Sequence, residues 1–249
     1  MDHRKLFNQD STLYASVRPS YPDRLFEYLS VCCQQHQAAW DCACGNGQAA
    51  IGLTGYFDAV FATDISQQQI ANAIQHPNVI YSVQPSESTA FHDEQFDIVC
   101  IAQALHWFDL DQFWPEVKRV LKPGGLFAAW GYSWFSISAP LDHSIQEEVL
   151  EFLRPYWPEQ NKLLWDHYRN LSFPFDPIQP PTIEMDVEWD LQQLFGYLRS
   201  WSATRHWLKE NGETQFHKAY QCAKAVWGDE KAKKTVKMDF CLVVGRNQD

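Results

Sequence analysis

Long hydrophobic runs and an excess of positive charge are both missing from this sequence. No continuous apolar stretch reaches the roughly 18 residues that a membrane-spanning helix needs, and the opening MDHRKLFNQDSTLY has no apolar core of the signal-peptide kind. Lys and Arg number 20 against 31 Asp and Glu, which gives a formal net charge of −11. That charge disfavours nucleic acid and anionic membranes as partners. We therefore expect a soluble, cytoplasmic protein with no membrane or nucleic-acid partner.

Metal-binding and redox spacings are missing as well. Among the seven cysteines, Cys32 and Cys33 are adjacent, and Cys42 and Cys44 are separated by one residue. Neither pair has the Cys-x-x-Cys spacing of zinc ribbons and redox sites. The nine histidines include no His-x-x-x-His pair. We expect reduced, packed thiols, no metal site and no metal requirement.

The 249 residues, of which 45% are hydrophobic, are enough to bury a substantial core. From residue 38 onward, short apolar runs alternate with segments of helical periodicity. The predicted strands are 38–43, 58–64, 78–83, 96–105 and 126–134, and the predicted helices are 21–35, 48–56, 66–75 (capped by Ser66) and 109–122 (ended by residues 122–125). This alternation predicts an α/β fold, a parallel sheet with helices on both faces.

The alternation stops after Trp134. Residues 140–171 and 190–228 are predicted to be helical. Between them lie a proline-rich connector, FPFDPIQPPT, and an edge strand at 182–189, and a final strand covers 235–246. Open α/β sheets bind ligands at the carboxyl ends of their strands, so we expect the helical insertion to lie over that edge.

The stretch AAWDCACGNGQAAIG, residues 38–52, joins a strand to a helix through a glycine turn. Gly45-x-Gly47-x-x-Ala50 satisfies the loose dinucleotide pattern, and Asp64 follows at the distance from which an acid binds ribose hydroxyls. Asp41 favours a different cofactor, because a carboxylate at the end of the first strand repels a pyrophosphate and attracts an ammonium or sulfonium. S-adenosylmethionine carries both of these cations.

The motifs between residues 38 and 131 resemble, in the same order, those of class I S-adenosylmethionine-dependent methyltransferases. WDCACGNGQ is similar to the first motif, ATDIS to the ribose-binding motif, QPSESTAFHDEQFDIV to the adenine-contacting loop with the fourth strand, and VLKPGGLFAAW to the segment that enters the fifth strand. Ala43 replaces the glycine of many members, a mild change if its backbone φ is negative. The resemblance implies a Rossmann-like, mostly parallel seven-stranded sheet with helices on both faces, an antiparallel last strand and a helical insertion after the fifth strand.

The flanking segments narrow the resemblance. YASVRPSYP, AQALHWFD and FGYLRSWSATRHW are together similar to the trans-aconitate methyltransferase-like group of type 11 methyltransferases. This implies methyl transfer from S-adenosyl-L-methionine, with S-adenosyl-L-homocysteine as product, to a small-molecule acceptor such as a carboxylic acid. We expect one domain, residues 1–249, that comprises an N-terminal lid and helix (1–37), a cofactor-binding core (38–134), a helical insertion on the acceptor side (135–234) and a final strand (235–249).

The resemblance also implies a set of site residues. Those expected to bind the cofactor are Tyr14, Arg18, Asp41, Cys44, Gly45, Gly47, Asp64, Ile65, Ser86, Glu87 and Gln103. Those expected on the acceptor side are His106, Trp107, Tyr132, Trp134 and Arg199. Gly47 is expected to permit close approach of the cofactor, and residues 1–20 to close over it as a lid.

The residues leave several questions open. His106 is either the base or acceptor-positioning group of the reaction or a structural hydrogen-bonding group beside the cofactor, because a carboxylate acceptor needs no base whereas a hydroxyl or nitrogen does. The alternatives to a methyltransferase are an NAD-dependent oxidoreductase and a non-catalytic S-adenosylmethionine-binding protein. The identity of the acceptor and the oligomeric state are open too.

Overall fold

The computed structural model describes residues 18–248. Tyr14 and most of the expected lid lie outside these residues, so closure of the lid stays a prediction. In the described part of the chain, no helix is both long and apolar enough to span a membrane. All seven cysteines are free thiols, and five of them are buried.

Eight strands form one mixed sheet. In chain order they are β1 (Ala38–Cys42), β2 (Ala59–Asp64), β3 (Val79–Val83), β4 (Phe96–Ala102), β5 (Leu121–Ser136), β6 (Asp176–Ile178), β7 (Met185–Trp189) and β8 (Lys234–Arg246). Their order across the sheet is β3-β2-β1-β4-β5-β8-β6, in which the pairs among β1 to β5 are parallel and β8 is antiparallel to β5. The predicted parallel sheet with a reversed last strand is confirmed.

The sheet has eight strands, one more than expected. β6 pairs with Val244–Arg246 of β8, and β7 pairs with Lys234–Met238 of the same strand. β6 lies in the segment predicted to be a proline-rich connector. Three residues that include a proline are too short a run to indicate a strand, although an edge position tolerates the proline. Two short strands therefore share the edge of β8 where one was expected.

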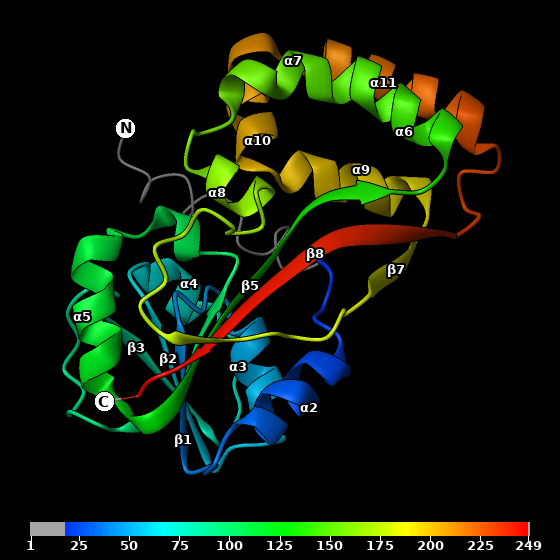
Figure 1. Ribbon diagram of the computed structural model, residues 1–249. Coiled ribbons are helices and arrows are strands. Elements are labelled where there is room, and N and C mark those ends of the chain that lie inside the picture. Colours follow the sequence, from blue (N-terminus) through cyan, green and yellow to red (C-terminus); the bar gives the residue numbers. More distant parts are fainter. Residues whose placement is uncertain (1–17, 249) are drawn as a thin grey trace.

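The helices before β5 cover both faces of the sheet. They are α2 (Asp23–Cys32), α3 (Gln48–Leu53), α4 (Gln67–Ala71), the 3-10 turn η2 (Leu105–Trp107) and α5 (Leu110–Val120). On β4, Ile98 and Cys100 belong to the core under α2 and α3, whereas Val99 and Ile101 belong to the core under α5. Figure 1 shows α5 and the α2–α3 pair on opposite sides of the strands. Burial on both faces explains why these strands are apolar along most of their length.

The residues after β5 build a helical layer around the far ends of the two longest strands, β5 and β8 (Figure 1). Its helices are α6 (Ala139–Ile145), the π-helical turn η3 (Gln146–Leu150), α7 (Glu151–Leu153), the 3-10 turn η4 (Arg154–Tyr156), α8 (Asn161–Trp165), α9 (Leu191–Ser200), α10 (Ser202–Asn211) and α11 (Thr214–Trp227). A separate apolar core, with Val149, Leu194 and Ala223 at its centre, holds the layer together.

Two expectations about local structure need correction. The span 140–171, expected to be helical, is interrupted at 157–160, where Pro158 lacks the N–H that a helix interior needs, and its residues after Trp165 are not helical. Residues 122–125 end α5 as predicted but lie within β5. Leu121 pairs with Phe96 and Leu126 with Ile98, so these residues form a bulge, with Gly124 at a φ of +75°.

The carboxyl ends of β1, β2 and β4 meet at one edge of the sheet. Cys42 on β1 pairs with Thr63 on β2 and with Ile101 on β4. Asp64 and Ala102, one residue further along, therefore lie at the same level. Ser66 caps α4 as predicted, since its hydroxyl oxygen accepts the Gln69 N–H at 3.2 Å.

Candidate active site

A cavity of about 740 Å³ lies at the edge where β1, β2 and β4 end, and we call it the strand-end cavity. Among the residues expected to bind a cofactor, it is lined by Arg18, Cys44, Gly45, Asp64, Ile65 and Gln103. Two residues expected on the acceptor side, Trp107 and Tyr132, line it as well. Asp41, Gly47, Ser86 and Glu87 are not in its lining, and Tyr14 lies outside the described residues.

The turn after β1 passes through left-handed backbone at three positions. The φ angle is +55° at Ala43, +55° at Gly45 and +87° at Gly47. The expectation of a negative φ at Ala43 is therefore wrong, and an L-residue in this conformation costs about 1–2 kcal/mol. Ala43 and Gly45 both line the strand-end cavity, and a Cβ built at Gly45 would meet nothing within 4 Å. Backbone strain at a cavity wall is typical of functional sites.

Gly47 is required by packing inside the protein. It precedes α3 as the N-cap, and a Cβ built there would lie 2.1 Å from the hydroxyl oxygen of Tyr81. That hydroxyl donates a hydrogen bond to the carbonyl oxygen of Ile74 at 2.7 Å, which fixes the ring over the glycine. Gly47 does not line the strand-end cavity, and its expected role in the close approach of a cofactor remains a prediction.

Asp64, at the end of β2, is fixed by the backbone on both of its oxygens. Oδ2 accepts a hydrogen bond from the Gly45 N–H at 2.9 Å, and Oδ1 accepts one from the Ser66 N–H at 2.8 Å. Burial raises the pKa of Asp64, and these backbone donors oppose the rise. The strand-end cavity thus has a carboxylate of defined orientation in its wall, which suits a ligand with hydroxyl donors.

Asp41 lies below the strand-end cavity rather than in its wall. Its side chain is fully buried on β1, between Ala62 of β2 and Cys100 of β4. Neither carboxyl oxygen forms a hydrogen bond of ordinary geometry with a described residue, although the Ala50 N–H lies near enough to affect the carboxyl pKa. Burial raises its pKa to about 8, an effect that the Ala50 N–H opposes and the nearby Asp64 increases. Asp41 does not line the cavity, and its carboxyl group is mostly protonated and neutral at pH 7, so its expected contact with a cofactor remains a prediction.

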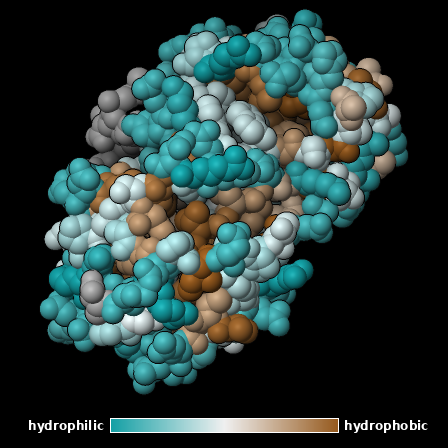
Figure 2. All heavy atoms as spheres, viewed as in Figure 1, coloured by the Kyte–Doolittle hydropathy of each residue, from teal (hydrophilic) through white to brown (hydrophobic). Residues whose placement is uncertain are grey.

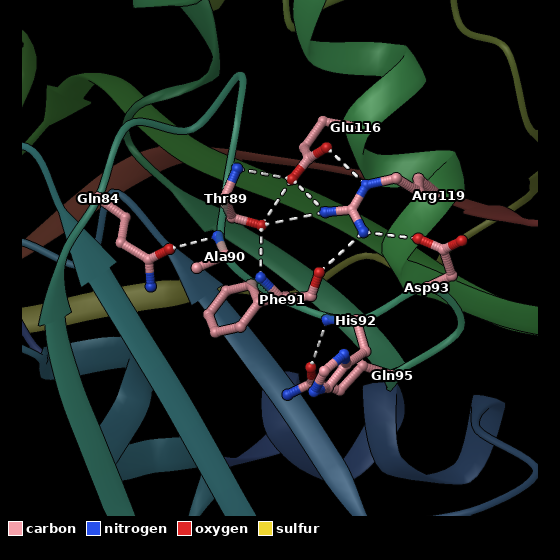
Figure 3. A network of polar contacts seen from close by, with 9 residues as sticks. All are labelled: Gln84, Thr89, Ala90, Phe91, His92, Asp93, Gln95, Glu116 and Arg119. Carbon is pink, nitrogen blue, oxygen red and sulfur yellow. Dashed lines mark hydrogen bonds and ion pairs between the residues drawn. The ribbon is translucent and has the colours of Figure 1, made fainter.

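A polar network holds the loop between β3 and β4 against α5 (Figure 3). Arg119 donates two hydrogen bonds to Glu116 and one to Asp93, at 2.7–2.9 Å. It donates another to the carbonyl oxygen of Phe91, and Glu116 accepts both the N–H and the hydroxyl of Thr89. Burial would raise the pKa of Glu116, but the hydrogen bonds from Arg119 and Thr89 outweigh it and lower the pKa.

Ser86 and Glu87 belong to this anchored loop. Both are partly buried, and neither lines the strand-end cavity. The hydrogen bonds of the network hold the segment that follows these residues, Thr89 to Asp93 (Figure 3). Ser86 and Glu87 are not among the residues of the network. Their expected contact with the cofactor remains a prediction.

A smaller cavity of about 90 Å³, which we call the aromatic cavity, adjoins the strand-end cavity. The two share Arg18, Gln103, Trp107 and Tyr132 in their linings. Five indole rings line the aromatic cavity: Trp107, Trp134, Trp157, Trp165 and Trp201. The two cavities are therefore neighbours, and a ligand bound in one would lie close to a ligand bound in the other, beside these four shared residues.

The charged side chains in the described lining of the aromatic cavity are both positive. Arg18 and Arg205 line it, and none of its described lining residues is Asp or Glu. The Arg18 guanidinium lies 5.3 Å from the ring centre of Tyr197 and donates to the hydroxyl of Tyr132 at 3.5 Å. In a chain of net charge −11, this part of the described surface thus brings two arginines together within aromatic walls.

His106 lies in η2 and lines the aromatic cavity. It is 7% exposed, and its Nδ1 lies 3.4 Å from the hydroxyl oxygen of Tyr168. Burial lowers the pKa of His106 to about 4, so the ring is neutral at neutral pH. Its position agrees with both interpretations made from the sequence, and the low pKa favours a role other than that of a strong base.

Arg199 is not part of either cavity, contrary to expectation. It lies in the last turn of α9 and forms a two-pronged ion pair with Glu213 at the surface. Arg205, six residues later on α10, lines the aromatic cavity instead. Both arginines belong to the same sequence segment, but Arg199 lies in the last turn of α9 and Arg205 lies on α10, beyond the break at Trp201.

Trp134 lines the aromatic cavity, as expected, but not the strand-end cavity. Sequence reasoning did not single out Tyr21 and Asn46 in the strand-end cavity or Asn161 in the aromatic cavity. Asn161 is 7% exposed, and its Oδ1 has no partner among the described residues. No periodic signal marks such residues, because they come from the ends of elements that are far apart in the chain.

Strained backbone also occurs near the aromatic cavity. Gln103, which lines both cavities, has a φ of +59°, and its side-chain amide donates to the Tyr132 carbonyl oxygen at 2.9 Å. His167 and Tyr168 have φ values of +53° and +57°. Within residues 18–248, no group of three or more His, Cys, Asp or Glu side chains is placed to hold a metal ion.

Comparison with known proteins gives consistent matches. Residues 40–129 match the family model of the methyltransferase domain. The chain is 30% identical over 207 residues to a proposed methyltransferase of Dictyostelium discoideum, a match covering 82% of this chain and 79% of that protein. It is 25% identical over 240 residues to a probable S-adenosylmethionine-dependent methyltransferase of Saccharomyces cerevisiae, covering 82% of each.

Solved structures show the same similarity. The structure of a proposed type II methyltransferase from Anaeromyxobacter dehalogenans matches with a TM-score of 0.86 at 34% identity. That match covers 92% of this chain and 98% of the other. The similarity therefore includes the helical layer after β5 as well as the sheet.

Proposed function

Because the chain belongs to the S-adenosylmethionine-dependent methyltransferase family, its reaction is methyl transfer from that cofactor, and we propose that the acceptor is a small carboxylic acid held in the aromatic cavity. Family membership favours a methyltransferase over the two alternatives considered from the sequence, an NAD-dependent oxidoreductase and a non-catalytic S-adenosylmethionine-binding protein. The observation that carries the proposal is that Arg18 and Arg205 both line the aromatic cavity, together with five indole rings, whereas none of the lining residues within 18–248 is acidic.

The strand-end cavity fits the cofactor. Asp64 would accept hydrogen bonds from the ribose hydroxyls, and Ile65, which is 47% exposed, would offer an apolar surface to the adenine ring. A cation bound in this cavity would favour the ionised form of the buried Asp41 and so oppose the rise of its pKa. When bound, S-adenosyl-L-methionine supplies an electrophilic methyl group, and S-adenosyl-L-homocysteine is the product.

The two arginines would orient the acceptor rather than change its protonation. Transfer to a carboxylate forms one O–C bond and breaks one C–S bond, and the negative charge of the acid and the positive charge of the sulfonium cancel. No proton is released, so the protein needs to hold, align and partly desolvate the acid. Aromatic walls and two fixed cations supply these functions, since attraction between opposite charges is stronger where water is excluded.

The test compares Arg205→Gln with Arg199→Gln in an assay with labelled cofactor and a panel of carboxylic acids, matched amides and alcohols. We expect Arg205→Gln to lower kcat/KM for acids roughly 10- to 150-fold, since a hydrogen bond to a charged group contributes about 1.5–3 kcal/mol. Arg205→Lys should recover part of this loss. Arg199→Gln is the matched control, because its ion pair with Glu213 lies outside both cavities, and it should leave the rate unchanged.

The product gives an independent readout. Methyl esters are cleaved by mild alkali with release of methanol, whereas N-methyl and ether groups are not. Methylation of amides or alcohols in preference to acids, together with an unaffected Arg205→Gln variant, would overturn the acid assignment.

A further inference from the structure

A second large cavity, which we call the distal cavity, lies on the far side of the aromatic cavity. Its volume is about 670 Å³, and it lies between the end of β5, the α6–η3 segment and α8. Trp134, Trp157 and Trp165 line both the distal and the aromatic cavities. Figure 2 shows a hollow with hydrophobic surface beneath the helical segment that Figure 1 labels α6 and α7. Three cavities therefore follow one another from the strand ends to the helical layer.

The charged residues of the distal cavity already have partners. Arg154 pairs with Glu151 at 2.6 Å, and Lys162 pairs with Glu159 at 3.4 Å. Asp142 accepts the Ile137 N–H at 2.8 Å. Each of these charged groups thus has a partner at the protein surface, and the remaining lining is mostly apolar.

That apolar surface includes Phe135, Ile145 and Leu150 in addition to the three shared indole rings. Ring centres within the indole cluster lie 5.2 Å apart for Trp134 and Trp165 and 5.7 Å apart for Trp157 and Trp165. The cluster is the common wall of the two cavities. Rings at these distances are in contact, so a ligand that occupies both cavities must run along the faces of the cluster.

The wall opposite the indole rings contains the one π-helical turn of the described residues, η3 (Gln146–Leu150). Its first and last residues both line the distal cavity. π-helical turns are rare and occur frequently at functional sites. The turn is thus a second, independent sign that the distal cavity serves a ligand.

We propose that the distal cavity takes the apolar tail of an elongated carboxylic acid, an inference that rests on the proposed function because Arg18 and Arg205 hold the carboxylate end. The aromatic cavity, at about 90 Å³, has room for a head group and little else. The cofactor occupies the space on its other side. An acceptor of more than a few carbon atoms must therefore extend past the indole cluster into the distal cavity.

The test uses straight-chain saturated monocarboxylates, from butanoate to tetradecanoate, as acceptors for the full-length protein with labelled cofactor. Each methylene that enters the cavity should raise kcat/KM about fourfold, the factor that corresponds to about 0.8 kcal/mol per buried CH₂. We expect this rise to extend along the series until the cavity is full.

Gln146→Trp is the informative variant, and Glu147→Trp is its matched control. Both positions are exposed on η3, but only Gln146 lines the distal cavity. We expect Gln146→Trp to abolish most of the chain-length dependence while butanoate is methylated as before, and Glu147→Trp to leave the whole series unchanged. Calorimetric titration of dodecanoate in the presence of S-adenosylhomocysteine should show the same loss of affinity in Gln146→Trp alone.

The outcomes separate the two proposals. Acids methylated without chain-length dependence, or a dependence that Gln146→Trp leaves intact, would overturn the distal-cavity assignment while the acid acceptor stands. If no acid of any length is methylated and dodecanoate does not bind, both proposals fail together, and the fault lies with the proposed function.

Discussion

The carboxylate of Asp64 accepts the backbone N–H of Gly45 at 2.9 Å, so the acid at the end of β2 also holds the turn that follows β1. The residue expected to bind the ribose therefore shapes the glycine turn itself. Stability and cofactor binding are consequently coupled at this position, and a substitution there should affect both.

Replacing Asp64 with Ala should remove hydrogen bonds to a charged group and lower the free energy of unfolding by about 1.5–3 kcal/mol. It should also weaken S-adenosylhomocysteine binding at least roughly tenfold, the effect of about 1.4 kcal/mol. Asp64→Asn keeps one acceptor oxygen and should lose less stability. Urea unfolding and calorimetric titration measure the two effects, with Asp58→Ala, an exposed residue that lines neither the strand-end nor the aromatic cavity, as control. Normal affinity in Asp64→Ala would contradict the cofactor assignment.

The burial of Asp41 predicts an unusual pH dependence. Its pKa is about 8 in the folded protein and about 3.9 in an unfolded chain. Between these values the folded state binds the extra proton, so stability is greatest below the unfolded pKa and falls as the pH rises toward 8. The slope should be on the order of 1 kcal/mol per pH unit.

Urea unfolding of the ligand-free protein at several pH values checks this expectation. Asp41→Asn should flatten the profile between pH 4 and 8, values taken from the two pKa limits, whereas Asp58→Asn, at an exposed position, should not. If the free energy of unfolding depended on pH in the same way in wild type and Asp41→Asn, the pKa of Asp41 would not be raised by folding, and the prediction would be wrong.

Gly47 and Gly45 allow a matched comparison of packing and backbone strain. Both have positive φ, but only at Gly47 would a Cβ collide with Tyr81. Gly47→Ala should therefore lower the free energy of unfolding by more than Gly45→Ala, which carries the conformational cost of about 1–2 kcal/mol alone. In a double-mutant cycle, Tyr81→Ala should relieve part of the cost of Gly47→Ala. Equal losses in the two alanine variants would contradict the packing role.

How much the sequence could predict depends on how local each feature is. The glycine turn, Asp64 and the Ser66 cap depend on residues close together in the chain, and all of them lie where the motifs indicated. Alternating apolar segments likewise predicted β1 to β5 and their parallel order, because two-sided burial has a clear sequence pattern.

Features that depend on tertiary packing were not predictable. Arg199 and Arg205 have similar surroundings in the sequence, but only Arg205 lines the aromatic cavity, whereas Arg199 pairs with Glu213. The positive φ of Ala43 results from how the turn fits between strands, against the residue's own preference. The three-residue β6 exists because β8 offers a free edge, which no local pattern indicates.

The reaction should proceed without a metal ion. A carboxylate acceptor is already ionised at neutral pH, and a sulfonium is already a good leaving group, so the displacement needs no Lewis acid. Activity should be unchanged after dialysis against a chelator. Activity that is lost on chelation and restored by magnesium would disprove this prediction.

His106 provides the sharpest distinction between acid and other acceptors. Its ring is neutral at neutral pH because burial lowers its pKa to about 4. A base this weak contributes little to removing a proton from a hydroxyl or amine, whereas a carboxylate acceptor has no proton to remove. We therefore expect no inflection of kcat near the ordinary histidine pKa of about 6.5.

His106→Ala should accordingly lose only about tenfold in rate, the effect of poorer positioning, instead of the 10²–10⁴ typical of a lost general base. Tyr168→Phe, which removes the partner of His106 Nδ1 and leaves the imidazole in place, is the control and should change the rate still less. Single-turnover rates and the alkali lability of the labelled product would be measured on the same samples. A collapse in rate for His106→Ala, paired with a product that resists alkali, would instead assign His106 as the base of an O- or N-methyltransferase.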